Sequence, residues 1–190
     1  LPSIYGASEP QMNANNLRTK GYELVLGWRD SFKLAGSTFS YGITGTFSDY
    51  TAEYTKCDNP TGLIGDPYVG KKYGEIWGYK VDGLFRNDKE AAEYASRNDL
   101  STVASGYYTA TGAYGKGVRG GDIKSLDLNG DNIVNGGKGT LDDPGDRRVI
   151  GNSSPRYQYG ASLNFSWYGF DVSVFMQGIG RLDWYPGADN

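Results

Sequence analysis

The sequence predicts an all-β protein that forms part of a large antiparallel transmembrane β-barrel, with long extracellular loops and one short loop helix. Three observations support this class: near-perfect alternation of apolar and polar residues in 157–178, a second alternating pair of segments near the N-terminus, and a long polar stretch between them. Side chains on a strand point to opposite faces at every step, so each alternating segment separates an apolar environment from a polar one.

The C-terminal pair of strands shows the pattern most clearly, with a turn expected near Tyr168–Gly169. Aromatic residues lie at the ends of its apolar row, as they do where a strand crosses a membrane interface. The apolar row of the first strand is Tyr157, Tyr159, Ala161, Leu163, Phe165 and Trp167, and that of the second is Phe170, Val172, Val174 and Met176.

The N-terminal pair is expected over 21–29 and from Ser37 to about Tyr54, with the turn either at Asp30–Ser31 or near Gly36. Each run is about the 9–11 residues needed to cross a bilayer at a tilt. Four such strands cannot close a barrel, because the smallest outer-membrane barrels have about eight. The chain therefore forms either a small sheet under a large loop domain or part of a larger wall.

These patterns divide the chain into barrel strands at 1–56, a long extracellular loop region at 57–155 and barrel strands at 156–190. The loop region contains one helix candidate, Asp88–Ala95, with Asn87 placed to cap it and Glu90 three residues later. A polar connection of this length is unusual in a compact sandwich and normal on the outer side of an outer-membrane barrel.

Composition excludes several function classes. The chain of 190 residues has a net charge of −3, which argues against nucleic-acid binding. It has no His, so the commonest general base and metal ligand is missing, and no nucleophile–base pair can be built; we expect no enzyme. Cys57 is the single cysteine, so no internal disulfide forms. A start at Leu1 and an end just after a strand predict a piece of a longer protein, and no apolar run of about 18 residues predicts a spanning helix.

One segment has the alternating oxygen ligands of a calcium loop. Asp127, Asn129 and Asp131 supply three side-chain oxygens, the carbonyl of Ile133 would follow, and a closing carboxylate would come from downstream, with Asp146 as the candidate. Lys138 stands where such loops normally close with Glu, and Asn132 where they have Gly. The competing interpretation is an Asx-rich turn held by side-chain-to-backbone bonds. No cofactor is required, and Ca²⁺ is the candidate ion.

A second candidate site is aromatic. Tyr73, Trp77 and Tyr79 interleave with glycines in the loop region. Such residues can stack on sugar rings or clamp a peptide, and they can equally fill a small loop core. They are the predicted substrate-binding residues.

Several motifs follow one another along nearly the whole chain. They are Asn16–Glu23, Gly78–Phe85, Asn87–Ala91, Gly121–Lys124, Asp127–Asp131, Asp146–Asn152, Pro155 and Phe170–Gly178. Taken together and in this order, they resemble the C-terminal part of SusC/RagA-type TonB-dependent outer-membrane transporters. The departures from the family pattern are Asn132 and the glycine-rich insert before Asp146.

The resemblance implies a nutrient importer in the outer membrane of a Gram-negative cell, with its loops outside. It implies a large closed barrel with a plug, a SusD-like surface lipoprotein as lid, outer-membrane lipid around the wall, and glycan or peptide as cargo. The TonB complex would bind through an N-terminal region that these 190 residues lack. The alternative is a secreted β-sandwich glycan-binding module, calcium-dependent if the loop binds the ion, with the same apolar rows hidden between two sheets.

Overall fold

The computed structural model describes residues 14–103 and 117–185, and strands predominate in it, which confirms the all-β class. The predicted barrel-strand ranges also include 1–13 and 186–190, which lie outside the described residues. The elements are β1 (Asn16–Leu34), β2 (Ser37–Lys56), β3 (Glu75–Tyr79), β4 (Val81–Leu84), α1 (Asp88–Ala95), β5 (Ile123–Ser125), β6 (Arg147–Asn152), β7 (Arg156–Trp167) and β8 (Phe170–Arg181).

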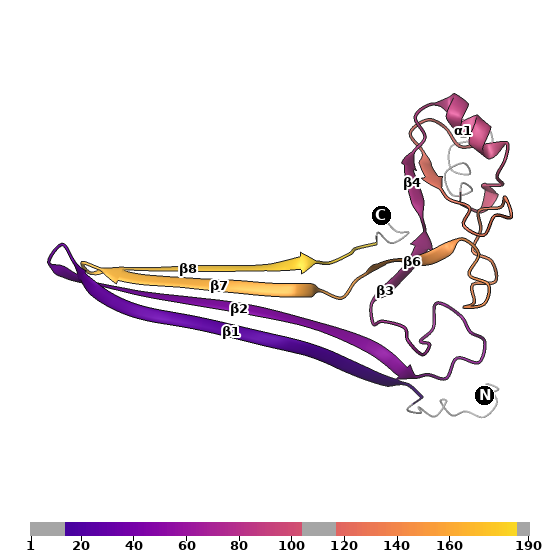
Figure 1. Ribbon diagram of the computed structural model, residues 1–190. Coiled ribbons are helices and arrows are strands. Elements are labelled where there is room, and N and C mark those ends of the chain that lie inside the picture. The colour runs from indigo at the N-terminus through magenta and orange to yellow at the C-terminus, as the bar shows by residue number, and fades with distance from the viewer. Residues whose placement is uncertain (1–13, 104–116, 186–190) are drawn as a thin grey trace, which may run out of the picture. The chain divides into compact units, whose positions relative to one another are not determined.

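The chain divides into two compact units. The sheet unit contains residues up to 57, the segment 69–74 and the residues from 152 onward, and the loop unit contains 58–68 and 75–151. In the sheet unit, β1, β2, β7 and β8 form one antiparallel sheet in that order (Figure 1). Within the described residues this sheet is open, with β1 at one edge and β8 at the other.

In each hairpin of the sheet, a two-residue turn connects the two strands. Ala35 and Gly36 have φ of 49° and 82°, and Tyr168 and Gly169 have φ of 50° and 80°. Positive φ at both central residues is the type I′ geometry, whose twist matches that of the flanking strands. The predicted turn at Tyr168–Gly169 and the alternative near Gly36 are therefore confirmed. The alternative at Asp30–Ser31 was wrong, because these residues continue β1 in register with β2.

The first hairpin is longer than its alternation predicted. β1 and β2 run for 19 and 20 residues, whereas β7 and β8 have 12 each. Polar residues at the start of β1 interrupt the apolar row but not the backbone pairing. At the start of β7, Tyr157 has φ of 57°, so regular alternation begins only after it, contrary to the prediction.

The extended end of β2 has its own partner. Pairing with β7 runs only from Ser40 to Ser48 of β2. Beyond it the segment 70–73 takes over, with the Tyr54 amide donating to the Lys71 carbonyl at 3.0 Å and the Tyr73 amide to the Ala52 carbonyl at 2.9 Å. This segment explains why 69–74 belongs to the sheet unit although it lies within the predicted loop region.

The loop unit holds two small sheets, β3 with β6 and β4 with β5, and the helix α1. The sequence did not predict these short strands. It did predict α1, whose bounds and cap are confirmed: the Asn87 side chain accepts from the Glu90 amide at 2.9 Å. A small core stabilises the unit. Its buried apolar residues are Ile64, Phe85, Ala91, Leu100 and Val134.

Candidate functional site

One face of the four-stranded sheet is apolar across all four strands. Directly opposite residues share a face, so the register places Trp28, Ile43, Leu163 and Val174 in one row across the sheet. The row beside it runs Leu26, Gly45, Ala161 and Met176. The predicted alternation in both hairpins is thus assembled into a single surface, which we call the apolar face.

The apolar face is exposed rather than packed against another layer. Leu26 is 65% exposed and Phe170 is 74% exposed. A monomeric soluble protein rarely exposes a contiguous apolar patch of more than a few hundred Å². A surface of this extent indicates contact with lipid or with another apolar surface.

Aromatic residues gather at the two ends of the apolar face. Near the short turns, the Phe32 and Phe39 rings lie 5.3 Å apart, Phe39 and Phe165 lie 6.1 Å apart, and the indole of Trp28 donates to the Tyr41 hydroxyl. At the opposite end the Tyr22 and Phe47 rings are 6.0 Å apart. We call these the turn belt and the far belt. Aliphatic residues dominate the rows between them.

The far belt also uses a glycine as a contact surface. Tyr159 lies opposite Gly178 on β8, and its ring lies across that residue. A Cβ at Gly178 would come within 2.5 Å of the Tyr159 ring, so a larger residue would displace that ring. The absence of a side chain on one strand thus lets an aromatic ring on the next lie flat on the sheet.

The opposite face of the sheet is mainly polar. One row joins Thr44 with Ser162, and another joins Gly42 with Asn164, which accepts a hydrogen bond from Ser173. Phe175, opposite Ser162, is an apolar exception on this face. The contrast between the two faces is the one the sequence predicted.

A partly buried ion pair between β2 and β7 lies just beyond the far belt. The Arg156 guanidinium binds both carboxylate oxygens of Asp49, at 2.5 and 2.6 Å, and the Tyr157 amide donates to the same carboxylate. Asp49 is buried. Bidentate pairing fixes the geometry of both partners, so this pair positions the left-handed residue Tyr157 at the start of β7.

In the loop unit, the predicted calcium loop is held by its own side chains. The Asp127 carboxylate accepts from the amides of Gly130 at 2.7 Å and Asn132 at 2.9 Å, and these bonds, with the Gly130 amide first, lower the pKa of Asp127. Asn129 accepts from the Asp131 amide and Asp131 from the Ile133 amide. These are Asx turns, as the competing interpretation predicted.

Asp146 is brought to this loop, as the sequence predicted, and is fully buried beneath it. One oxygen accepts from the amides of Leu128 and Asn129 at 2.7 and 3.3 Å, and the other from the Asn135 amide at 2.9 Å. Both carboxylate oxygens therefore bond to backbone. Among the described residues, no group of three or more Asp, Glu or Cys is arranged to hold a metal ion.

The predicted aromatic residues do not share one unit. Trp77 and Tyr79 are on β3 in the loop unit, whereas Tyr73 belongs to the sheet unit and is 55% exposed. The partner of Trp77 is Tyr68, whose ring is 6.5 Å away. The Tyr68 hydroxyl donates to Glu75 at 2.6 Å, and burial together with this bond raises the pKa of Tyr68 to about 12.

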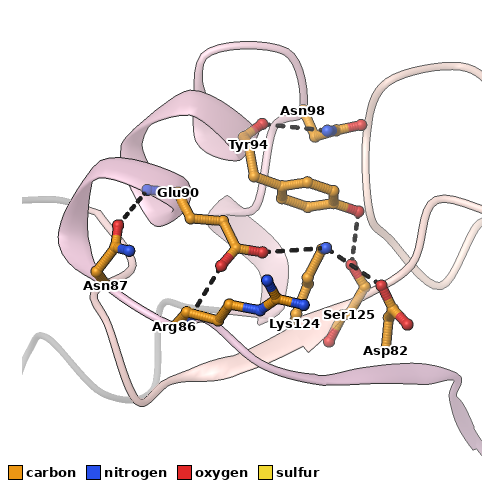
Figure 2. Close-up of polar contacts among 8 residues, drawn as sticks. All are labelled: Asp82, Arg86, Asn87, Glu90, Tyr94, Asn98, Lys124 and Ser125. Carbon is orange, nitrogen blue, oxygen red and sulfur yellow. Dashed lines mark hydrogen bonds and ion pairs between the residues drawn. The ribbon is translucent and has the colours of Figure 1, made fainter.

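Sequence reasoning missed a cluster around Lys124 on β5 (Figure 2). Its ammonium lies 3.2 Å from Asp82 and 3.4 Å from Glu90, and 5.5 Å from the centre of the Tyr94 ring. The bond to Asp82 raises the pKa of Lys124, so the amine stays charged and is not a nucleophile. The cluster joins α1 to β4 and β5. Lys124 is 34 residues from Glu90 and still farther from Asp82 in sequence, and no local pattern indicates that they meet.

Among the described residues, no helix is long and apolar enough to span a membrane. Comparison with protein-family models and with curated proteins gives no match to this chain.

Proposed function

We propose that the sheet unit is a section of barrel wall and the loop unit an outer loop region of a TonB-dependent importer in the outer membrane. The observation that carries the proposal is the exposed apolar face with an aromatic belt at each end. Transmembrane barrels have this arrangement: an outward apolar band about 25 Å tall flanked by aromatic girdles, and a polar interior.

The dimensions of the apolar face agree with this role. From Tyr22 to Phe32 the row advances about ten residues, or roughly 34 Å at about 3.4 Å per residue. Strands in such barrels tilt by about 40°, which reduces this length to roughly 26 Å across the membrane. The two edges of the sheet also suit a longer wall, because β1 and β8 each pair on one side only within the described residues.

Connectivity supports the proposed orientation. Both type I′ turns lie at one end of the sheet (Figure 1), and the chain enters and leaves the loop unit from the other end, after β2 and before β7. Outer-membrane barrels have short periplasmic turns and long extracellular loops. The turn belt would then lie at the periplasmic side and the far belt at the outer surface.

The remaining parts of the proposal rest on the resemblance to SusC/RagA-type transporters. A SusD-like lipoprotein would cover the extracellular side, a TonB complex would act through a region outside this chain, and glycan or peptide would be the cargo. The chain takes no catalytic part. A soluble β-sandwich binding module is the weaker alternative, because it requires a second sheet over the apolar face.

A pair of adjacent substitutions tests the orientation. Leu163 lies in the middle of the apolar face and Ser162 on the polar face. We expect Leu163→Arg to weaken membrane insertion by about 2–4 kcal/mol, because the charge would lie near the bilayer midplane, and Ser162→Arg to be tolerated. Urea titration of folding into lipid vesicles measures both. Equal insertion of the two variants, or a monodisperse protein without detergent, would favour the soluble module.

Calcium binding by the 127–135 loop stays a prediction. A bound ion would raise the melting temperature of the loop unit when Ca²⁺ is added, and Asp127→Ala would abolish the rise. Lys138→Ala is a matched control outside the oxygen ligands. No shift in the unsubstituted protein at millimolar Ca²⁺ would leave the loop as an Asx-rich structural turn.

A further inference from the structure

Basic side chains continue the apolar face beyond the far belt. Along β1, Lys20 and Arg18 follow Tyr22 at two-residue steps, so they share its face. Arg18 is opposite Glu53 on β2, and Lys20 is opposite Thr51. Both basic residues are exposed.

Two further cations reach the same area from other segments. Lys72, on the segment beside β2, binds Glu53, and Arg156 on β7 binds Asp49. Asp49 is opposite Tyr22 on β1, so its partner Arg156 lies beside the far belt. We call Arg18, Lys20, Lys72 and Arg156 the basic cluster.

The basic cluster carries excess positive charge. Glu53 and Asp49 are each paired with one cation, and Arg181, opposite Arg156, is paired with Asp183. Arg18 and Lys20 make no direct ion pair within the described residues and act only at longer range on Glu53. Arg18 and Lys20 are therefore the two exposed cations of the cluster that are open to an external anion.

A small hollow lies within this area. It has a volume of about 80 Å³, and its lining includes Thr51, Lys72, Asn152, Ser154 and Arg156. Ammonium, guanidinium, hydroxyl and amide groups are the donors that recognise phosphate oxygens. Asn152 and Ser154 already donate to the Tyr73 carbonyl, and Lys72 and Arg156 already bind Glu53 and Asp49. The charges left to bind a phosphate are therefore those of Arg18 and of Lys20, which is opposite Thr51 in the lining of the hollow.

We propose that the basic cluster binds the phosphate groups of a lipid headgroup in the outer leaflet of the membrane. This inference rests on the proposed function, which places the apolar face in lipid. Lys20 and Arg18 lie about 7 and 14 Å beyond Tyr22 along the strand, or roughly 5–10 Å in depth after tilt. The polar region of each leaflet is about 5–8 Å thick, so Lys20 lies at headgroup level and Arg18 just beyond it, within reach of its long side chain.

Binding is tested with the full protein in nanodiscs that contain phosphorylated diglucosamine glycolipid or the same lipid without its phosphates. The variant is Arg18→Gln with Lys20→Gln. The matched control is Arg29→Gln with Lys33→Gln, which removes two cations from the polar face of the same strand. Lipid retained per protein is measured by mass spectrometry after detergent extraction.

We expect the unsubstituted protein and the control to retain the phosphorylated lipid, and the Arg18/Lys20 variant to retain roughly 25-fold less, since each of the two cations contributes about a factor of five near an anionic surface. The exchange Arg18→Lys with Lys20→Arg keeps the charge and should keep retention. Equal retention by variant and control, or of the lipid without phosphates, overturns the proposal. Full displacement by inorganic phosphate also overturns it, in favour of a free-anion site.

The outcomes separate this inference from the function on which it rests. A protein that inserts normally and retains no phosphorylated lipid disproves the headgroup site and leaves the barrel-wall role standing. A protein that enters no bilayer, with or without the glycolipid, disproves both.

Discussion

The loop unit buries a set of apolar side chains in a small core, whereas most apolar side chains of the sheet unit lie on an exposed face. Phe85 in the loop unit is 2% exposed, and Phe170 in the sheet unit is 74% exposed. The buried polar groups differ as well: Asp146 bonds to backbone amides, and Asp49 bonds to Arg156. One chain thus contains a unit built around a water-excluding core and a unit whose apolar surface requires an external partner.

The largest expected effect tests the buried side of this comparison. We expect Phe85→Ala to destabilise the loop unit by about 3–5 kcal/mol, because it removes a buried aromatic ring that packs against Tyr94 at 5.6 Å. Hydrogen exchange of the amide at position 85, which is bonded to the Asp122 carbonyl, reports the opening. Phe170→Ala is the control and should leave this exchange unchanged. Similar effects of both changes would contradict the division into two kinds of unit.

A smaller effect is expected at Asp146. Asp146→Asn removes the charge and turns an amide group toward backbone N–H donors, so at least one of the amides of Leu128, Asn129 and Asn135 loses its acceptor. We expect a loss of about 2–3 kcal/mol in the free energy of unfolding of the loop unit. Chemical unfolding followed by exchange of the Val134 amide measures it. Asp142→Asn, at an exposed position, should cost little; an equal cost would show that Asp146 does not pin the loop.

The sequence predicted the sheet better than the loop unit because alternation is a local signal. Leu163 and Ile43 each have polar or small neighbours in sequence, so the alternation predicts which face of the sheet they occupy. Gly36 and Gly169 predict the turns. The beginning of β1 was missed because Arg18 and Lys20 break the apolar row, although pairing with β2 continues through them. The backbone ladder does not require apolar side chains, so composition alone ends the strand too early.

Loop-unit contacts join residues that are distant in sequence. Lys124 meets Asp82 and Glu90 only after β4, β5 and α1 have assembled. The helix itself was predictable, since Asn87 and Glu90 form a local cap. Tyr73 was grouped with Trp77 because they are near in sequence, but the segment 70–73 pairs with β2 and so joins the sheet unit. Spacing could not show where that pairing ends.

The smallest expected effect is a loss of stability of the loop unit in acid. It arises from the Asp127 carboxyl, which belongs to the loop unit and not to the sheet unit. The pKa of Asp127 is lowered by backbone hydrogen bonds, first by that from Gly130. A carboxyl whose pKa is lower in the folded protein contributes stability above its unfolded pKa and loses it as the pH falls through the folded value. We therefore expect this contribution to be present at neutral pH and to be lost below about pH 4.

The loss is measured as the protection of the Gly130 and Asn132 amides from hydrogen exchange between pH 6 and pH 3. The rates are corrected for the intrinsic pH dependence of exchange. Asp127→Asn should reduce protection at neutral pH and flatten the pH dependence, because the amide side chain does not titrate. Asp142→Asn should leave the profile unchanged. A profile that is the same with Asp and Asn at position 127 would show that the other Asx turns hold the loop. Acid would then act on the loop unit through a different carboxyl. Glu90, whose pKa is lowered by the hydrogen bond from the Arg86 amide, would be the next group to replace.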